Sequence, residues 1–160
     1  MPINSFLYPG ASGPPAPYDV ANSLRFNRGS SDSLERTPSS ASNRRTFTFS
    51  CWFKLGKLAS STSDFYQLFG GNSGGVNDGL WIDSNDRLYV YIDSGERRIT
   101  TQKLRDPSSW YHVVLAIDTT QSTASNRIKL YVNGVQETSF STYSVLENLA
   151  TFFNDNTRIC

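Results

Sequence analysis

Residues 110–118 read WYHVVLAID and residues 127–136 read RIKLYVNGVQ, with a polar loop between them. Both stretches are rich in β-branched, aliphatic and aromatic residues, which predicts two long β-strands. The second stretch runs through Asn133-Gly134, a pair that tolerates positive φ and therefore predicts a tight turn. These two strands favour an all-β protein.

The rest of the chain has the same character. Of its 160 residues, 13% are aromatic and only 18% are charged, and no segment of a dozen residues shows the 3.6-residue period of a helix. Short strands separated by turn residues indicate a sandwich or jelly roll. The expected strands are residues 23–27, 34–37, 45–55, 65–70, 78–83, 87–93, 97–103, 110–119, 127–133 and 135–140.

The pattern inside some of these strands is specific. Phe47 and Phe49 alternate with hydroxyl residues, so both rings should face the same side of their strand. Asn85-Asp86 should join its two flanking strands as a hairpin.

The sequence of residues 110–118 and 127–136 resembles that of the laminin-G-like, concanavalin A-like lectin domains. Residues 37–54, TPSSASNRRTFTFSCWFK, and residues 107–138 resemble more narrowly the version of that domain found in phage virion proteins. The resemblance covers residues 20–157. It implies a concanavalin A-like jelly-roll sandwich of two antiparallel sheets.

The resemblance also implies a function. The leading interpretation is a non-enzymatic virion structural protein, either a tail-fibre or tail subunit or a head-decoration subunit. Its partners would be other virion proteins, and its location the virion assembled in the host cytoplasm. The alternative is a carbohydrate-binding domain that attaches to host surface glycans. One fold hosts many functions, so both interpretations stay open.

Residues 1–22 form a distinct segment that contains five of the seven prolines. Proline fixes φ and removes backbone donors, so this segment should be an extended arm. It is either a disordered tail or an arm that docks on a neighbouring subunit. We favour docking because the arm carries four large apolar side chains, Phe6, Leu7, Tyr8 and Tyr18.

Residues 23–160 should form the laminin-G-like jelly roll. Domains that it resembles continue beyond the equivalent of residues 154–157 with closing strands, whereas three residues follow here. We therefore expect unpaired edges beside strands 110–119 and 127–133. Such edges require a cover, which would be either a homo-oligomer, with a trimer favoured, or further polypeptide.

The sequence argues against an enzyme. Glycoside hydrolysis needs paired carboxylates, and none of the four glutamates has another acid two residues away. His112 is the only histidine and is expected in a structural role. Trp110, on the same face of its strand, is expected to be largely buried, so its replacement by alanine should cost about 3–5 kcal/mol.

Two groups of residues are candidate binding sites. Trp81, Tyr89 and Tyr91 lie in adjacent strands of one hairpin and could stack on sugar rings if the register places them on one face. Calcium is the one cofactor left open, with Asp78 and Asp118 as candidate oxygen ligands near turns.

Other features exclude whole classes of partner. The net charge is +1 and no long basic run exists, so nucleic acid is not an expected partner. No apolar run approaches the length of a membrane span. The glycine-rich residues 70–75 lack the lysine and helix of a phosphate loop and are expected to be a flexible loop. Cys51 should be a buried free thiol, since a disulfide to the terminal Cys160 is not expected.

Overall fold

A computed structural model describes residues 22–73, 75–93, 95–143 and 146–156. The chain divides into two compact units, residues 1–33 and residues 34–160. Residues 1–21 of the predicted arm, with the docking candidates Phe6, Leu7, Tyr8 and Tyr18, lie outside the described residues, as does Cys160.

The described part of the first unit contains a short 3-10 turn, η1 (Arg28–Ser30). The strand expected at residues 23–27 is absent from it. The Asn27 backbone N–H donates to the Asp32 carboxylate at 2.8 Å, and the Asn27 side chain accepts from the Gly29 backbone N–H at 3.1 Å. Such local side-chain bonds offer the backbone an alternative to strand pairing.

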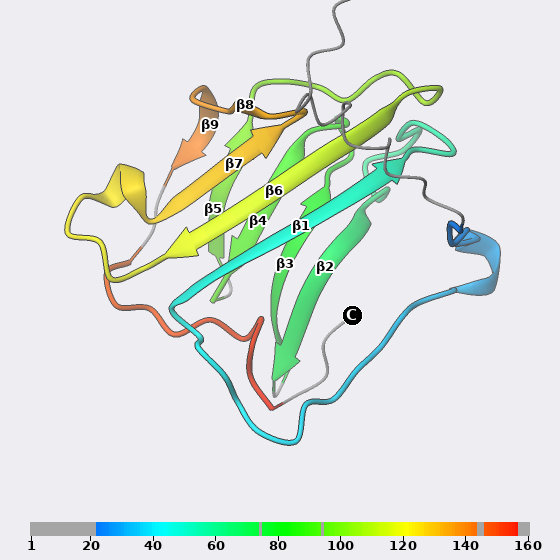
Figure 1. The fold of residues 1–160 in the computed structure, drawn as a ribbon. Coiled ribbons are helices and arrows are strands. Elements are labelled where there is room, and N and C mark those ends of the chain that lie inside the picture. Colours follow the sequence, from blue (N-terminus) through cyan, green and yellow to red (C-terminus); the bar gives the residue numbers. More distant parts are fainter. Residues whose placement is uncertain (1–21, 74, 94, 144–145, 157–160) are drawn as a thin grey trace, which may run out of the picture. The chain divides into compact units, whose positions relative to one another are not determined.

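The second unit is built from two antiparallel sheets, which confirms the predicted jelly-roll sandwich (Figure 1). The four-stranded sheet has the order β1 (Thr46–Lys54), β6 (Trp110–Asp118), β7 (Ile128–Val132) and β8 (Val135–Gln136). The five-stranded sheet has the order β2 (Tyr66–Ser73), β3 (Val76–Ile82), β4 (Leu88–Ile92), β5 (Gly95–Thr100) and β9 (Phe140–Tyr143). A 3-10 turn, η2 (Ala124–Asn126), precedes β7, and the described residues contain no α-helix.

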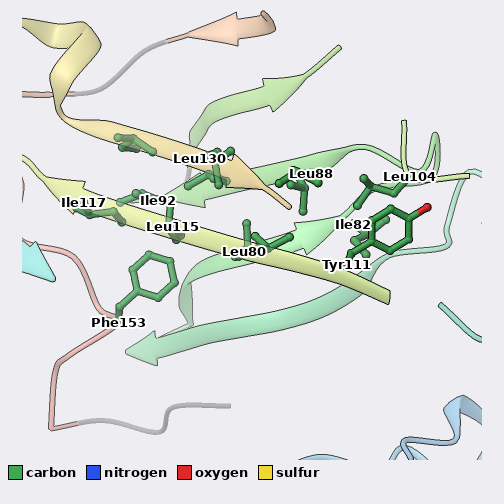
Figure 2. Packing of buried hydrophobic residues seen from close by; sticks show 14 of the residues in the cluster. Leu80, Ile82, Leu88, Ile92, Leu104, Tyr111, Leu115, Ile117, Leu130 and Phe153 are labelled. Atoms are coloured by element: carbon green, nitrogen blue, oxygen red, sulfur yellow. The ribbon is translucent and has the colours of Figure 1, made fainter. Parts of the chain in front are cut away.

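The hydrophobic core lies between the two sheets (Figure 2). Alternate residues of the central strands point into it, as the strand period of two requires. Those of β3 and β4 are Leu80, Ile82, Leu88, Val90 and Ile92, and those of β6 and β7 are Val113, Leu115, Ile117, Ile128, Leu130 and Val132. Phe47 and Phe49 of β1 both pack against this cluster, as their alternation predicts.

Strand β6 presents Trp110 on the opposite face from the one expected. The odd-numbered residues of β6 point into the core, so Trp110 lies on the outward face with 52% of its surface exposed. The expected burial of Trp110 is therefore wrong, and with it the large cost of its truncation. Both faces of this strand carry apolar residues, so the pattern alone could not say which face is buried.

Three other expectations are corrected. Residues 34–37 contain only a single β-bridge, at Arg36. Residues 135–140 are not one strand, because the chain leaves the four-stranded sheet after β8 and joins the other sheet at β9. The expected flexible loop at residues 70–75 is largely strand: Gly70 and Gly71 are buried in β2 and paired with β3.

The strand pairing shows where the sheet edges lie. Strand β6 is paired on both sides, with β1 over nine residue pairs and with β7 over five. The expectation of missing closing strands beside residues 110–119 and 127–133 stays a prediction. Among the described strands, the edges are β1 and β8 in one sheet and β2 and β9 in the other.

Candidate functional site: the outward face of the five-stranded sheet

The hairpin register brings the predicted aromatic residues together. Trp81 of β3 lies directly opposite Tyr89 of β4, and Tyr91 is two residues further along β4. All three therefore project from the outward face of the sheet, opposite to the core, and all three are half-buried. The ring centroids of Tyr89 and Tyr91 are 5.9 Å apart.

A fourth aromatic ring extends this surface. Phe65, which directly precedes β2, has its ring centroid 6.3 Å from that of Tyr89. Its side chain is 44% exposed. Sequence reasoning did not select Phe65, because β3 lies between β2 and β4 and only the folded sheet brings the Phe65 ring to Tyr89.

Two glycines shape the middle of the same face. Gly70 of β2 is paired with Gly79 of β3. A Cβ atom on Gly79 would overlap the indole of Trp81, and one on Gly70 would overlap the amide of Gln67. The indole and the amide therefore lie directly over glycine backbone. Because no side chain projects from the two glycines, the outward surface is flat there. The buried Trp81 indole N–H has no hydrogen-bond partner in the described part of the chain.

Amide side chains border the flat region. Gln67 lies opposite Trp81, and Asn72 lies opposite Asn77 and hydrogen-bonds to it through the two side chains. Half-exposed rings beside amide groups can bind a hydroxyl-rich ring, since the ring faces stack on its apolar C–H face and the amides bond its hydroxyls. We name this outward surface, formed by Phe65, Gln67, Asn72, Asn77, Trp81, Tyr89 and Tyr91, the aromatic face.

The two calcium candidates lie in different sheets. Asp78 is buried in β3, where one carboxylate oxygen accepts from the Asp93 N–H at 2.8 Å and the other from the Phe152 N–H at 2.6 Å. Asp118 ends β6 in the other sheet, and hydrogen bonds from Thr120 and Gln121 lower the pKa of its carboxyl. No cluster of three or more His, Cys, Asp or Glu side chains that could hold a metal occurs in the described ranges.

Burial dominates the electrostatics of Asp78. Desolvation raises the pKa of this carboxyl above its ordinary value, against the opposing effect of its two backbone hydrogen bonds. Both carboxylate oxygens already accept hydrogen bonds from main-chain N–H groups. Asp78 therefore links β3 to the segment around Phe152.

His112 and Cys51 are the other residues with possible chemistry. The His112 Nε2 atom lies 2.8 Å from the Ser50 hydroxyl, and its ring stacks on Trp52 with centroids 4.8 Å apart. No hydrogen bond within the described residues orients the second ring nitrogen, as a catalytic triad would require. Burial raises the pKa of the Cys51 thiol to about 11, which keeps it in the unreactive protonated form.

The sequence matches the family described as the concanavalin A-like lectin/glucanases superfamily, Laminin_G_3, over residues 28–156. The chain belongs to this family. No curated protein and no solved structure gives a significant match.

Membership of the concanavalin A-like superfamily agrees with the sandwich and places both lectins and glucanases among its relatives. Of the four glutamates, only Glu96 lies in a described strand. No described helix has the length and apolar character needed to cross a membrane.

Proposed function

We propose that this chain is a non-enzymatic carbohydrate-recognition module of the concanavalin A-like superfamily, and that the aromatic face holds the glycan. One observation carries the proposal: the β3–β4 register places Trp81 opposite Tyr89 rather than on the other side of the sheet. A slip of one residue would have sent the indole into the core and removed the platform.

The composition of the aromatic face supports a neutral glycan. Its members are aromatic rings and amides, and the one charged residue paired with any of them in the described strands is acidic, Glu96 of β5, opposite Tyr91. Such a surface binds through stacking and hydrogen bonds and offers nothing to select phosphate or carboxylate groups.

The test is a binding assay on an array of bacterial surface glycans, followed by calorimetry with the best-bound glycan. Trp81→Ala should weaken binding about tenfold or more, because it removes the largest stacking surface. Val135→Ala is the matched control, since Val135 is a 70% exposed apolar side chain on the other sheet. Equal binding by both variants, with unchanged thermal unfolding, would contradict the proposal.

The setting that we propose for this module is a phage particle. The support is the resemblance of residues 37–54 and 107–138 to phage virion proteins. In that setting the chain is a tail-fibre, tail or decoration subunit whose partners are other virion proteins and further copies of itself, in a trimer. It assembles into the virion in the host cytoplasm.

The arm provides the test of this setting. Deleting residues 1–22 should leave the β-type circular-dichroism spectrum unchanged, because no described core residue precedes Phe47. The same deletion should abolish incorporation into particles, as measured by mass spectrometry of purified virions. Normal incorporation without the arm would refute its docking role, whatever the outcome of the glycan assay.

A further inference from the structure

The outward face of the other sheet carries two exposed tryptophans. Trp52 of β1 is 63% exposed and Trp110 of β6 is 52% exposed. Trp52 is paired with His112 and Trp110 with Lys54, so the two indoles occupy diagonal positions at one end of the β1–β6 ladder. Exposed aromatic side chains close together on one face are a feature of interaction sites on proteins.

The Trp52 ring is held in a defined position. It stacks on the His112 ring at an interplanar angle of 22°, and His112 is itself hydrogen-bonded to Ser50. The His112 backbone is tied to the β7–β8 turn, where its N–H donates to the Asn133 side chain at 2.9 Å and its carbonyl accepts from the Asn133 N–H at 2.8 Å. A ring fixed by its neighbours loses little entropy when a ligand stacks on it.

The opposite end of the same two strands forms a shallow pocket of about 330 Å³ that is lined by both polar and apolar residues. Its lining includes Thr48, Ala116, Asp118, Gln121, Asn126 and Lys129. This volume lies at the lower end of the range for ligand pockets. The Asp118 carboxylate already accepts hydrogen bonds from Thr46, Thr120 and Gln121, so a ligand hydroxyl would share it with them. The Thr48 hydroxyl, the Asn126 amide and the Lys129 ammonium group can each bond a ligand hydroxyl.

Small side chains connect the two ends. Between Trp52 and Thr48 the outward residue of β1 is Ser50, which is paired with Val114 of β6. Thr48 and Trp52 are four residues apart, which corresponds to about 13 Å along a strand. A single sugar ring cannot reach both the tryptophans and the pocket, whereas an extended chain of rings can.

The charge of this face selects among extended ligands. The pocket carries one carboxylate, Asp118, whose lowered pKa keeps it ionised, and one ammonium group, Lys129. The pair has no net charge, and Lys54 is the one further ionic group beside the tryptophans in the described β1–β6 ladder. A polyanion such as nucleic acid would meet no basic cluster here, while a neutral hydroxyl-rich chain meets donors and acceptors of both kinds.

We propose that the outward face of the four-stranded sheet is a second binding site, which takes a neutral oligosaccharide lying along β1 and β6. One sugar unit stacks on Trp52 and Trp110, and a unit further along bonds the pocket around Asp118 and Gln121. This site goes beyond the proposed function because it shares no residue with the aromatic face.

The test uses the 160-residue chain and neutral hexose oligomers of the cello-, malto- and laminari-series, from one to six units, in calorimetric titrations. At least one series should bind with an affinity that rises with chain length. Trp52→Ala should lower the affinity for the longest oligomer about tenfold or more, and Trp52→Tyr, which keeps a stacking ring, should recover much of it. Gln121→Ala should lower the affinity for the longest oligomer more than the affinity for the shortest.

Two comparisons distinguish this site from the aromatic face. Val135→Ala, on the same sheet, should bind like the wild type. A loss of binding caused by Trp81→Ala but not by Trp52→Ala would overturn this second site and leave the proposed function standing. The reverse result would support the second site, and the aromatic face would still be decided by the glycan-array test.

Two further outcomes would overturn the proposal. One is the absence of binding to every oligomer in the three series. The other is a change in sedimentation caused by Trp52→Ala without a change in oligosaccharide binding, which would make this face a contact between copies of the chain.

Discussion

At the scale of single residues, Gly71 shows how a contact with a segment distant in sequence can restrict a position to glycine. It lies in β2, and a Cβ atom there would overlap the backbone carbonyl of Phe152. Backbone atoms cannot move aside as the end of a flexible side chain can, so the segment around Phe153 would have to shift out of the core.

We therefore expect Gly71→Ala to lower the free energy of unfolding by about 1–3 kcal/mol, the usual cost of overpacking. Gly56→Ala is the matched control, because a Cβ atom at Gly56 meets nothing within 4 Å. Chemical denaturation of both variants measures the difference. Equal stability would show that the contact with Phe152 is not maintained in solution.

Asp78 gives a prediction about pH. Burial raises the pKa of its carboxyl in the folded state above the ordinary value of 3.8. The folded protein therefore holds the proton more tightly than the unfolded chain, and the contribution of Asp78 to stability is fully present below that ordinary value. It is lost as pH rises through the raised folded pKa.

The variant Asp78→Asn removes this titration. The unfolding free energy of the wild type minus that of the variant should be largest at acidic pH and should fall as pH rises above 3.8, reaching a plateau at neutral pH. Denaturation curves at a series of pH values provide the measurement. A difference that grows with pH would mean that the two backbone hydrogen bonds outweigh desolvation.

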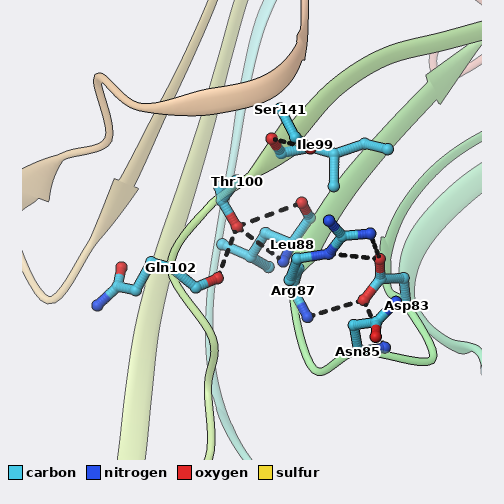
Figure 3. A network of polar contacts seen from close by, with 8 residues as sticks. All are labelled: Asp83, Asn85, Arg87, Leu88, Ile99, Thr100, Gln102 and Ser141. Carbon is cyan, nitrogen blue, oxygen red and sulfur yellow. Dashed lines mark hydrogen bonds and ion pairs between the residues drawn. The ribbon is translucent and has the colours of Figure 1, made fainter.

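At the scale of elements, the β3–β4 hairpin determines the aromatic face. Its turn is held by a polar network in which Asp83 accepts from the Asn85 and Arg87 N–H groups, each at 2.9 Å, and forms an ion pair with the Arg87 side chain (Figure 3). The Thr100 hydroxyl, accepting from the Leu88 N–H at 3.1 Å, links this hairpin to β5.

Asp86 is the residue of this turn with positive φ, at 62°. Its carbonyl accepts from the Leu104 N–H at 2.7 Å, and its side chain accepts from the Ala59 N–H at 2.9 Å. Asp86→Ala should lower the unfolding free energy by about 1–3 kcal/mol. It removes the buried acceptor of the Ala59 N–H and places alanine in a left-handed backbone conformation that alanine disfavours.

Asp86→Gly separates the two causes, since glycine relieves the backbone strain but still leaves the Ala59 N–H without its acceptor. It should therefore lose less stability than Asp86→Ala. Thermal unfolding of the two variants provides the comparison. A glycine variant that is the less stable of the two would show that backbone strain is not the reason for Asp86.

At the scale of the whole molecule, the edges that no described strand covers have a consequence for association. Strand β1 is an edge of nine residues with an uninterrupted register, and it contains no proline or bulge that would block pairing with another strand. We expect the 160-residue chain to self-associate, with a trimer as the favoured state. Sedimentation velocity at several concentrations measures this, and a monomer at all of them would contradict it.

The variant Ser50→Pro, in the middle of β1, is not informative here because it would also disturb the pairing with β6. Thr48→Lys is the better probe, since Thr48 is exposed and a lysine on an edge strand opposes edge-to-edge pairing. It should reduce association without lowering the thermal stability of the fold.

The sequence alone determined the fold class and most of the strands. Apolar alternation and turn residues are local signals, so β1, β3, β4, β6 and β7 lie close to where they were expected. The same alternation placed Trp110 and His112 on one face of β6, because the strand period of two depends on the backbone only.

Only the tertiary structure decided which face of a strand is buried and which strands meet. Trp110 is exposed because the odd-numbered side of β6 faces the other sheet, and no local pattern distinguishes two apolar sides. Trp81 meets Tyr89 because of the hairpin register, and Gly71 lies against Phe152 because a segment late in the chain returns to β2. These outcomes depend on packing between segments far apart in the sequence, which is why composition and periodicity could not supply them.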